Sequence, residues 1–340
     1  MKGKTPWIEG QAVANGRSVP RASTRLSGAD RWGGLKVRWN VGRGRYAVEP
    51  GLYAAGDPTP DSPVLVSANY KLSFDALRES LAGLHAWILV LDTRGVNVWC
   101  AAGKGTFGTE ELIRRIAAVR LEEVVSHRGL VLPQLSAPGV SAPEVKKRAG
   151  WTVRYGPVRA RDLKAYFAAG QKKDRAMREV RFALSDRMAV APVELTQAWP
   201  LLLAAVVGSA LLALPPSGGW PSRFLAALIP LVGSVLVATF AFPALLPWLP
   251  FRAFALKGAV LGAAWGAAGA LATGSSAAAG AGLTLMSTAM ASFIAMNFTG
   301  SSTYTCQAGA ALEVRRGLLP MAASLVAGIG LAAASRIFAL

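Results

Sequence analysis

The 340-residue sequence is poor in the side chains that most often carry catalysis or bind metals. It contains two cysteines, Cys100 and Cys306, and two histidines, His85 and His127. No Cys-x-x-Cys pair occurs, so we expect neither a disulfide framework nor a zinc site. The set of cysteines that an iron–sulfur cluster needs is also missing. Two distant cysteines without a framework are typical of a reducing compartment.

Acidic residues are scarce, and charge of either sign almost disappears from the C-terminal part. The chain has 37 Lys and Arg against 19 Asp and Glu, a formal charge of +18. Spread over a soluble protein, that charge would favour a nucleic-acid partner. However, only six basic residues and one acidic residue follow position 195. The asymmetry predicts a basic soluble domain followed by a membrane domain, with no nucleic acid as partner. The charged N-terminus has no apolar core after it, so we expect no signal peptide.

From residue 64 onward, short apolar β-rich runs alternate with segments of helical spacing. This alternation predicts a Rossmann-like α/β domain over about residues 60–170, with a mostly parallel sheet and helices on both faces. The expected strands are 64–68, 86–91, 129–133 and 151–155, and the expected helices are 72–84, 110–119, 141–149 and a helix from 161.

The segments on either side of this domain are basic. Residues 1–59 are predicted to be an N-terminal extension whose first thirty or so residues are disordered. The alternating apolar positions of 35–46 indicate an edge strand or hairpin. Residues 171–195 are predicted to form a linker helix near the anionic membrane surface, and a solvated connector helix is equally consistent with their composition.

Residues 97–109 lie between an expected strand and an expected helix and contain three glycines. The sequence predicts a loop at the carboxyl end of a strand, where α/β sheets bind ligands. It is not a phosphate-binding P-loop, because Gly103-Lys104 is followed by Gly105 and Val98 stands where the first glycine is required. Cys100 lies inside this segment. A small, soft side chain that fills a gap is the simplest interpretation of a lone cysteine.

The string Asn-Val-Trp-Cys-Ala-Ala-Gly-Lys at 97–104 resembles the cap-helix motif of the mercury-methylating corrinoid proteins. These are membrane-bound relatives of the large subunit of the corrinoid iron–sulfur protein of the acetyl-CoA pathway. The match is complete over eight residues and includes both Trp and Cys. Residues 64–71, 132–135 and 155–159 also resemble the corrinoid domain of that family.

The resemblance implies methyl transfer from methylcobalt(III) to Hg(II), giving methylmercury, with Cys100 as the lower axial ligand of cobalt. Neither histidine lies in the Asp-x-His-x-x-Gly pattern that many corrinoid proteins use, and a thiolate is a soft ligand. Trp99 and Phe107 would form an apolar wall, although Trp99 is equally consistent with a core position. Asn97 and Lys104 would fix the motif by hydrogen bonds.

Strand ends and the resemblance together predict the contacts to a base-off corrinoid of the cobalamin type. The predicted contact residues are Ser67, Asn69, Tyr70, Asn97, Val98, Trp99, Ala101, Ala102, Gly103, Lys104, Gly105, Thr106, Phe107, Gln134, Gly156, Pro157, Val158 and Arg159. The family also implies two partners in anaerobic one-carbon metabolism. These are a small ferredoxin-like electron donor with two iron–sulfur clusters and a folate-type methyl donor.

The C-terminal part, residues 196–340, is predicted to cross the membrane. A span needs about 20 apolar residues, and the distribution of basic residues places the N-terminal domain in the cytoplasm. The glycine- and alanine-rich third and fourth spans suit close helix packing. Cys306 could present mercury, but a thiol without function is equally consistent. The five expected spans are about 198–214, 224–246, 254–273, 277–298 and 318–334.

Two other functions remain open at this point. One is a membrane-anchored corrinoid protein that methylates another acceptor. The other is a ligand-sensing membrane protein, which would place ionisable residues along a pathway through the spans. The expected spans carry almost none, so this alternative ranks last.

Overall fold

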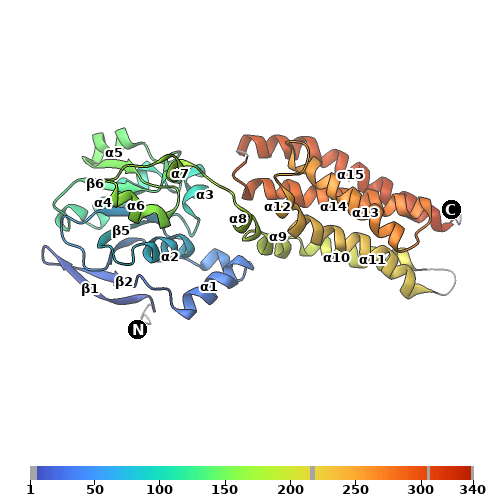
Figure 1. The fold of residues 1–340 in the computed structure, drawn as a ribbon, viewed down its shortest axis with the longest axis horizontal. Coiled ribbons are helices and arrows are strands. Elements are labelled where there is room, and N and C mark those ends of the chain that lie inside the picture. The colour runs from blue at the N-terminus through green and yellow to red at the C-terminus, as the bar shows by residue number, and fades with distance from the viewer. Residues whose placement is uncertain (1–5, 215–218, 305–306, 338–340) are drawn as a thin grey trace. The chain divides into compact units, whose positions relative to one another are not determined.

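The computed structural model describes residues 6–214, 219–304 and 307–337 (Figure 1). The chain divides into two compact units. The first, the α/β unit, comprises Met1–Val37 and Val41–Val180, and the second, the helical unit, comprises Arg38–Asn40 and Arg181–Leu340.

The α/β unit contains seven strands and several short helices. The strands are β1 (Ile8–Ala14), β2 (Arg17–Ala22), β3 (Gly51–Ala55), β4 (Val64–Ala68), β5 (Ala86–Leu91), β6 (Gly129–Leu132) and β7 (Thr152–Tyr155). The α-helices are α1 (Gly28–Arg38), α2 (Lys71–Ser80), α3 (Val98–Gly103), α4 (Thr109–Ala118), α5 (Ala142–Ala149), α6 (Leu163–Ala168) and α7 (Arg175–Arg178). Short 3-10 turns are η1 (Arg43–Arg45), η2 (Leu121–Glu123), η3 (Gln134–Ser136) and η4 (Ala160–Asp162).

All seven strands form one sheet in the order β1-β2-β3-β5-β4-β6-β7. The pairs β5–β4, β4–β6 and β6–β7 are parallel, whereas β3 runs antiparallel to β5 and β1 forms a hairpin with β2. The prediction of a mostly parallel sheet is therefore confirmed for the strands after residue 60. The expected strands 64–68 and 86–91 coincide with β4 and β5 residue for residue.

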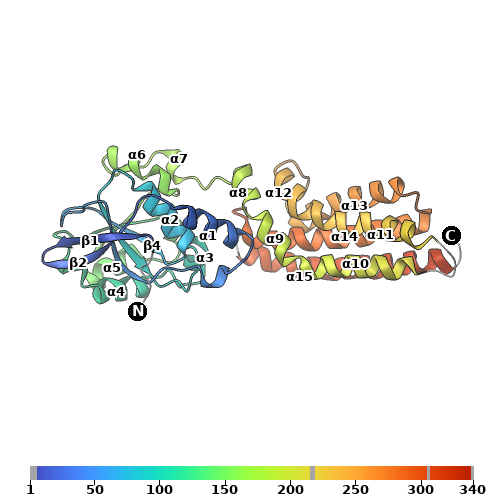
Figure 2. The ribbon, with the colours of Figure 1, turned by 90° about the horizontal axis from the view of Figure 1, so that it is seen from below.

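The side chains of β5 show why the sheet is covered on both faces. Every residue of β5 is buried, and successive side chains of a strand point to opposite faces. Leu89 belongs to a core that includes residues of α4 and α5, and its neighbour Val90 belongs to a second core that includes residues of α2 and α6. Figure 2 shows α4 and α5 on one side of the strands and α6 on the other.

The N-terminal predictions are wrong where the structure describes the chain. Residues 8–22 form a hairpin, and Trp7 packs edge-on against Tyr53 and Phe74 with ring centroids 5.3 and 4.9 Å apart. The segment expected to be an edge strand or hairpin contains instead the end of α1 and η1.

Helix α1 begins with a capping box formed by Ser27 and Asp30, since each side chain accepts from the other's backbone N–H, at 2.9 and 3.2 Å. Residues 1–5 lie outside the described part.

The basic segment 171–195 is not one linker helix. After α7 the chain is extended from Glu179, and helices resume only at α8 (Leu184–Met188) and α9 (Ala191–Gln197). Asp174 begins α7 by accepting from the backbone N–H of Met177 at 2.7 Å, and Met177 is buried in the core of the α/β unit. Met177 therefore anchors this segment to the α/β unit.

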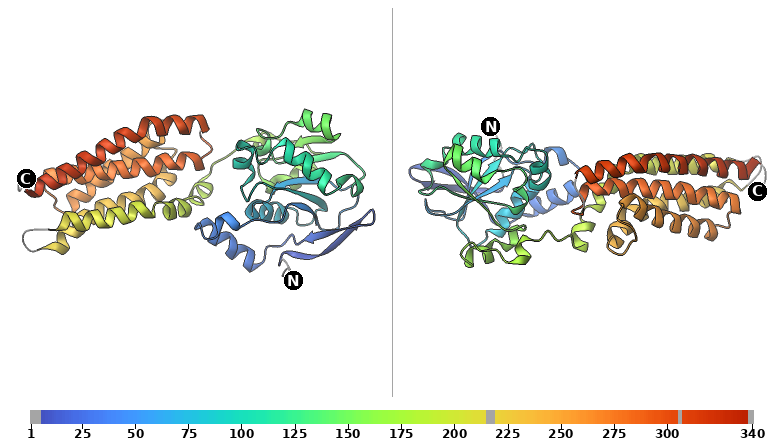
Figure 3. Two further views of the ribbon diagram at one scale, coloured as in Figure 1. Left: turned by 180° about the vertical axis from the view of Figure 1, so that it is seen from behind. Right: turned by 90° about the horizontal axis from the view of Figure 1, so that it is seen from above.

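Within the described residues, the helical unit contains four helices long and apolar enough to cross a membrane: Trp220–Leu245, Phe254–Ala272, Ala277–Ser301 and Ala308–Ser335. The expected first span coincides with α10 (Trp199–Ala213), which meets the criterion only together with Leu184–Gln197, across a bend of 56°. Five spans are therefore not confirmed. The elements are α11 (Trp220–Leu236), the π-helix η5 (Val237–Ala241), α12 (Phe242–Leu245), α13 (Phe254–Ala272), α14 (Ala277–Phe298), η6 (Thr299–Ser301) and α15 (Gln307–Ile337), and Figure 3 shows the long helices side by side.

Small residues bring α13 and α14 together, as their composition predicts. Gly258, Gly262 and Gly266 recur every four residues along one face of α13. A Cβ at Gly262 would lie 2.6 Å from the carbonyl oxygen of Ser287 and 2.8 Å from Cα of Thr288, both backbone atoms of α14. The two helices pack backbone to backbone, a close approach that small residues allow.

Candidate functional site

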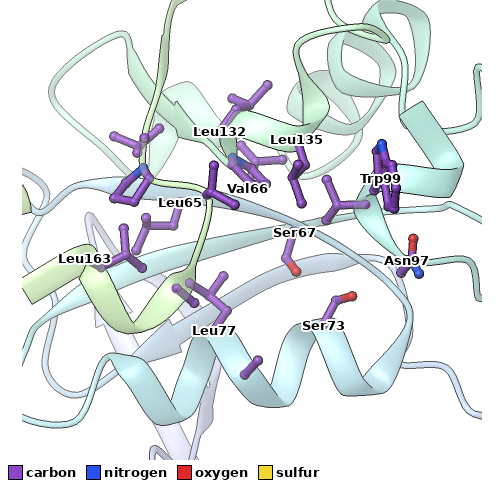
Figure 4. Close-up of a pocket in the computed structure, with 18 residues that line it drawn as sticks. Leu65, Val66, Ser67, Ser73, Leu77, Asn97, Trp99, Leu132, Leu135 and Leu163 are labelled. Carbon is purple, nitrogen blue, oxygen red and sulfur yellow. The ribbon is translucent and has the colours of Figure 1, made fainter. Parts of the chain in front are cut away.

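A cavity of about 300 Å³ lies at the carboxyl ends of β4 and β6 (Figure 4). The chain leaves β4 through α2 to β5 on one side, then crosses to β6 on the other side of β4. Because the direction of winding reverses here, this crevice is the switch point at which open α/β sheets bind ligands. The cavity is therefore where this fold places a ligand.

The cavity wall is mostly apolar, with a few polar groups. Leu132 and Leu135 contribute from β6 and the segment after it, and Leu163 contributes from α6. Ser67 at the end of β4 and Ser73 on α2 carry hydroxyl groups on opposite sides of the space in Figure 4. An apolar wall with a few convergent polar groups is typical of a pocket for an organic ligand or cofactor.

Helix α3 forms one end of the cavity and carries the motif. Asn97 is its N-cap, and the side-chain oxygen of Asn97 accepts from the backbone N–H of Cys100 at 2.9 Å. Val98 and Trp99 line the cavity, while Ala101 is fully buried in the core beneath. The prediction of a loop is therefore wrong for residues 98–103, whereas a helix agrees with the cap-helix resemblance.

Close backbone contacts hold α3 in place. A Cβ at Gly139 would lie 2.2 Å from the carbonyl oxygen of Phe107 and 2.9 Å from Cα of Ala102, so only glycine fits. The carbonyl oxygen of Gly139 also accepts from the N–H of Thr109 at 3.2 Å. Phe107 is fully buried in the core and does not line the cavity. Phe107 therefore does not belong to the wall of this cavity, and its contact with a ligand stays a prediction.

Cys100 is a free, partly exposed thiol on α3. This exposure disfavours the interpretation of Cys100 as a filler of the core. Its sulfur does not belong to the cavity wall, although the three residues before it do. Among the described residues, no group of three or more His, Cys, Asp and Glu side chains is placed to hold a metal ion. The arrangement offers one soft ligand beside a pocket for an organic molecule. It suits a metal ion that is already bound within a macrocyclic cofactor.

Seven of the predicted contact residues line the cavity: Ser67, Asn97, Val98, Trp99, Gly156, Pro157 and Val158. The structure does not bring the others to the cavity wall: Asn69, Tyr70, Ala101, Ala102, Gly103, Lys104, Gly105, Thr106, Phe107, Gln134 and Arg159. Sequence reasoning missed the wall formed by α2 and α6, which includes Ser73, Ala76, Leu77 and Leu163. The helical spacing of 73, 76 and 77 directly after a strand end was the available signal.

Several predicted contact residues instead stabilise the segments around the cavity. The side-chain oxygen of Asn69 accepts from the N–H of Thr93 at 3.1 Å and from the N–H of Gly95 at 2.9 Å, which ties the end of β4 to the turn after β5. Gln134 accepts from the ammonium group of Lys173. Burial lowers the pKa of Lys173, and the positive charge of Arg178 lowers it further.

A buried ion cluster fixes the start of α2, the helix that lines one side of the cavity. The Lys71 ammonium nitrogen lies 2.6 Å from a carboxylate oxygen of Asp30 and 2.7 Å from one of Asp75, and Arg78 contacts the same two carboxylates. Burial by itself would raise the pKa of Asp30. Hydrogen bonds from Lys71, Ser27 and Arg78 outweigh burial and hold that pKa well below its ordinary value of 3.8.

Comparisons with known proteins place the similarity over this unit. The family model of the CO dehydrogenase/acetyl-CoA synthase delta subunit matches residues 42–167. The acetyl-CoA decarbonylase/synthase complex subunit gamma of Archaeoglobus fulgidus is 36% identical over 137 residues, which cover 39% of this chain and 29% of the relative. The same subunit of Methanopyrus kandleri is 38% identical over 111 residues, covering 32% and 24%. The chain thus spans less than a third of these relatives, and its α/β unit is similar to subunits of an enzyme complex of acetyl-CoA metabolism.

Proposed function

We propose that the protein binds a base-off corrinoid at the strand-end cavity and transfers a methyl group from it to Hg(II), forming methylmercury. When bound, the corrinoid supplies a cobalt centre that carries the methyl group. The Cys100 thiolate would hold that cobalt. One observation carries the proposal. The eight-residue motif forms a capped helix at the switch point of the sheet, with Val98 and Trp99 in the cavity wall and a partly exposed thiol directly after them.

The residues of this chain bind and orient the cofactor. Leu132, Leu135 and Leu163 offer an apolar surface that excludes water. The hydroxyl groups of Ser67 and Ser73 can hydrogen-bond to the amide side chains of a corrinoid. Asn97 fixes the backbone at Cys100 and so fixes where the thiol can reach. The Cys100 thiolate would hold the cobalt as a soft, electron-rich ligand.

The remaining parts of the proposal follow from what the chain lacks and from its helical unit. The sequence lacks the cysteines for an iron–sulfur cluster, so reduction of the cofactor needs a separate donor. We propose a small ferredoxin-like protein with two clusters and a folate-type methyl donor. The apolar helices are proposed to anchor the chain in the cytoplasmic membrane, with the α/β unit in the cytoplasm.

The optical spectrum of the full chain in mild detergent, loaded with cobalamin, tests the proposal. A base-off spectrum with a thiolate-type shift is expected in the wild type and in Cys306→Ala, the control that removes the other cysteine. The shift should disappear in Cys100→Ala, together with methylmercury formation from methylcobalamin and Hg(II). Identical spectra in both variants would overturn Cys100 as the axial ligand, and failure of all three proteins to retain cobalamin would overturn the corrinoid assignment.

A second candidate function is methyl delivery to an acceptor other than Hg(II). The similarity to subunits of the acetyl-CoA decarbonylase/synthase complex favours it, since that similarity carries no information about mercury. Competition separates the two. If the methylated product of another soft metal acceptor forms faster than methylmercury when that acceptor and Hg(II) are supplied together, the second candidate is favoured.

A further inference from the structure

Helix α1 leaves a stripe of large apolar side chains uncovered. Trp32 and Leu35 are 60% and 46% exposed, and Trp39, which follows the last residue of α1, is 42% exposed. Residues three and seven positions apart lie on the same side of a helix. Trp32, Leu35 and Trp39 therefore form one continuous surface, here called the α1 stripe.

The end of α1 is well defined, so Trp39 keeps its place in the stripe. Asn40 adopts a left-handed backbone with φ of 63°, and the N–H of Val41 donates to the carbonyl oxygen of Lys36 at 2.9 Å. This is the pattern of a Schellman motif. Val41, directly after it, is also 58% exposed.

Basic side chains border the stripe, and no exposed acidic group accompanies them. Lys36 lies on one side of it and Arg31 with Arg38 on the other, and all three are exposed. Between residues 28 and 46 the sequence has a single acidic residue, Asp30. Asp30 is buried in the ion cluster with Lys71 and Arg78. Every exposed charged side chain between residues 28 and 46 is therefore basic.

The opposite face of α1 is firmly attached to the α/β unit. A Cβ at Gly34 would lie 3.2 Å from a methyl group of Leu72, and one at Gly33 would lie 2.6 Å from the hydroxyl oxygen of Tyr46. Leu72 is in the first turn of α2, next to the carboxyl end of β4. Helix α1 therefore lies at the strand-end edge of the sheet, and whatever covers the stripe lies near the edge that contains the cavity.

We propose that the α1 stripe docks into the headgroup region of an anionic membrane. Tryptophan prefers the membrane–water interface, and an apolar face flanked by Lys and Arg is the pattern of helices that lie in the plane of that interface. The helices of the second unit are long and apolar enough to cross a bilayer, and this inference rests on the proposal that they do. The docked stripe holds the strand-end edge of the α/β unit next to the lipid headgroups. This inference does not depend on the corrinoid.

The test uses the full chain with Cys100 and Cys306 both changed to Ser, so that one introduced thiol reports on the stripe. Leu35→Cys is exposed to a water-soluble maleimide in nanodiscs of phosphatidylcholine and in nanodiscs of equal parts phosphatidylcholine and phosphatidylglycerol. We expect modification to be about tenfold slower in the anionic discs, in line with the attraction of three basic residues. High salt should restore the faster rate by screening.

Two further variants separate docking from other causes. Glu122→Cys places the thiol at an exposed position in η2 and should react equally fast in both kinds of disc. Combining Leu35→Cys with Arg31→Gln, Lys36→Gln and Arg38→Gln should abolish the effect of phosphatidylglycerol. Equal rates for Leu35→Cys in both discs would overturn the proposal. Slow modification in both discs and in detergent would also overturn it, because protein rather than lipid would then cover the stripe.

Discussion

Both units of the molecule place glycine where two backbones approach, but different forces surround the contact. In the α/β unit, Gly139 meets the backbone at Ala102 and Phe107, and this unit also has a large apolar core and a buried ion cluster elsewhere. In the helical unit, Gly258, Gly262 and Gly266 form a repeated stripe against α14. Burial of apolar surface from water stabilises the first contact. In the proposed membrane the second would depend on close packing, since lipid is as apolar as the side chains. A local defect should therefore have different consequences in the two units.

Gly139→Val should produce the largest effect. The new side chain would overlap the carbonyl oxygen of Phe107 and Cα of Ala102, and backbone atoms cannot rotate away. Overpacking costs 1–3 kcal/mol or more, and we expect about 3 kcal/mol or more here, with α3 displaced from the cavity. The midpoint of thermal unfolding, followed by tryptophan fluorescence of the full chain in detergent, measures it. Gly51→Val, where a Cβ meets nothing within 4 Å, should leave the midpoint nearly unchanged; equal losses would refute this account.

Asp30→Asn should have the next largest effect, because it removes a negative charge from the buried ion cluster. The glycine stripe on α13 has no such cluster. A hydrogen bond to a charged group contributes about 1.5–3 kcal/mol, and Lys71 retains Asp75 as a partner. The pKa of Asp30 is lowered on folding. Its ionised form therefore stabilises the fold fully above the unfolded pKa of about 3.9, and this contribution is lost as pH falls below that value.

The pH dependence provides the control for this substitution. Wild-type stability should fall below about pH 4 more steeply than the stability of Asp30→Asn, so the two curves should converge in acid. Thermal midpoints measured from neutral to acidic pH test it. Parallel curves would show that the charge of Asp30 does not matter to folding.

The sequence predicted the parallel core of the α/β unit because its signal is local. Strands buried on both faces read as continuous apolar runs, and the runs at 64–68 and 86–91 match β4 and β5. Strands β1 and β2 lack this signal, because they pair with each other in a hairpin with few buried residues, and β3 lacks it because its partners are distant in sequence. Ala54 of β3 pairs with Trp87 of β5 and with Arg21 of β2, and local periodicity contains no trace of such pairing.

The sequence predicted only part of the candidate site. Both the predicted part and the missed part have physical explanations. Strand ends located the cavity, since the ends of β4 and β6 and the segment 156–158 all line it. Helix α3 was read as a loop because six residues followed by glycines carry too little helical periodicity. Its formation depends on the Asn97 cap and on Gly139, which is far along the chain. Glycine and alanine composition alone did predict the close packing of α13 on α14.

Gly262→Leu should destabilise the helical unit without altering the α/β unit. The side chain would force α13 away from Ser287 and Thr288, at a cost of about 1–3 kcal/mol. Gly330→Leu is the matched control, because a Cβ at Gly330 in α15 meets nothing within 4 Å. An SDS titration monitored by circular dichroism should show a lower midpoint for Gly262→Leu only. If Gly262→Leu also loses cobalamin retention, the two units are coupled. A defect in one unit would then not be confined to that unit.

Asn97→Ala should have the smallest effect on stability, about 1 kcal/mol for the loss of an N-cap. The matched substitution in the helical unit is Ser276→Ala, since Ser276 caps α14 by accepting from the N–H of Ala279 at 3.4 Å. Helix α14 has 22 residues and many buried positions, whereas α3 has six. Removing the cap should therefore fray α3 over its whole length and fray only the first turn of α14. Hydrogen exchange measures both: amides of 98–103 should exchange faster in Asn97→Ala, while those in the middle of α14 should be unchanged in Ser276→Ala. An unchanged α3 would mean that the contacts at Gly139 hold it without the cap.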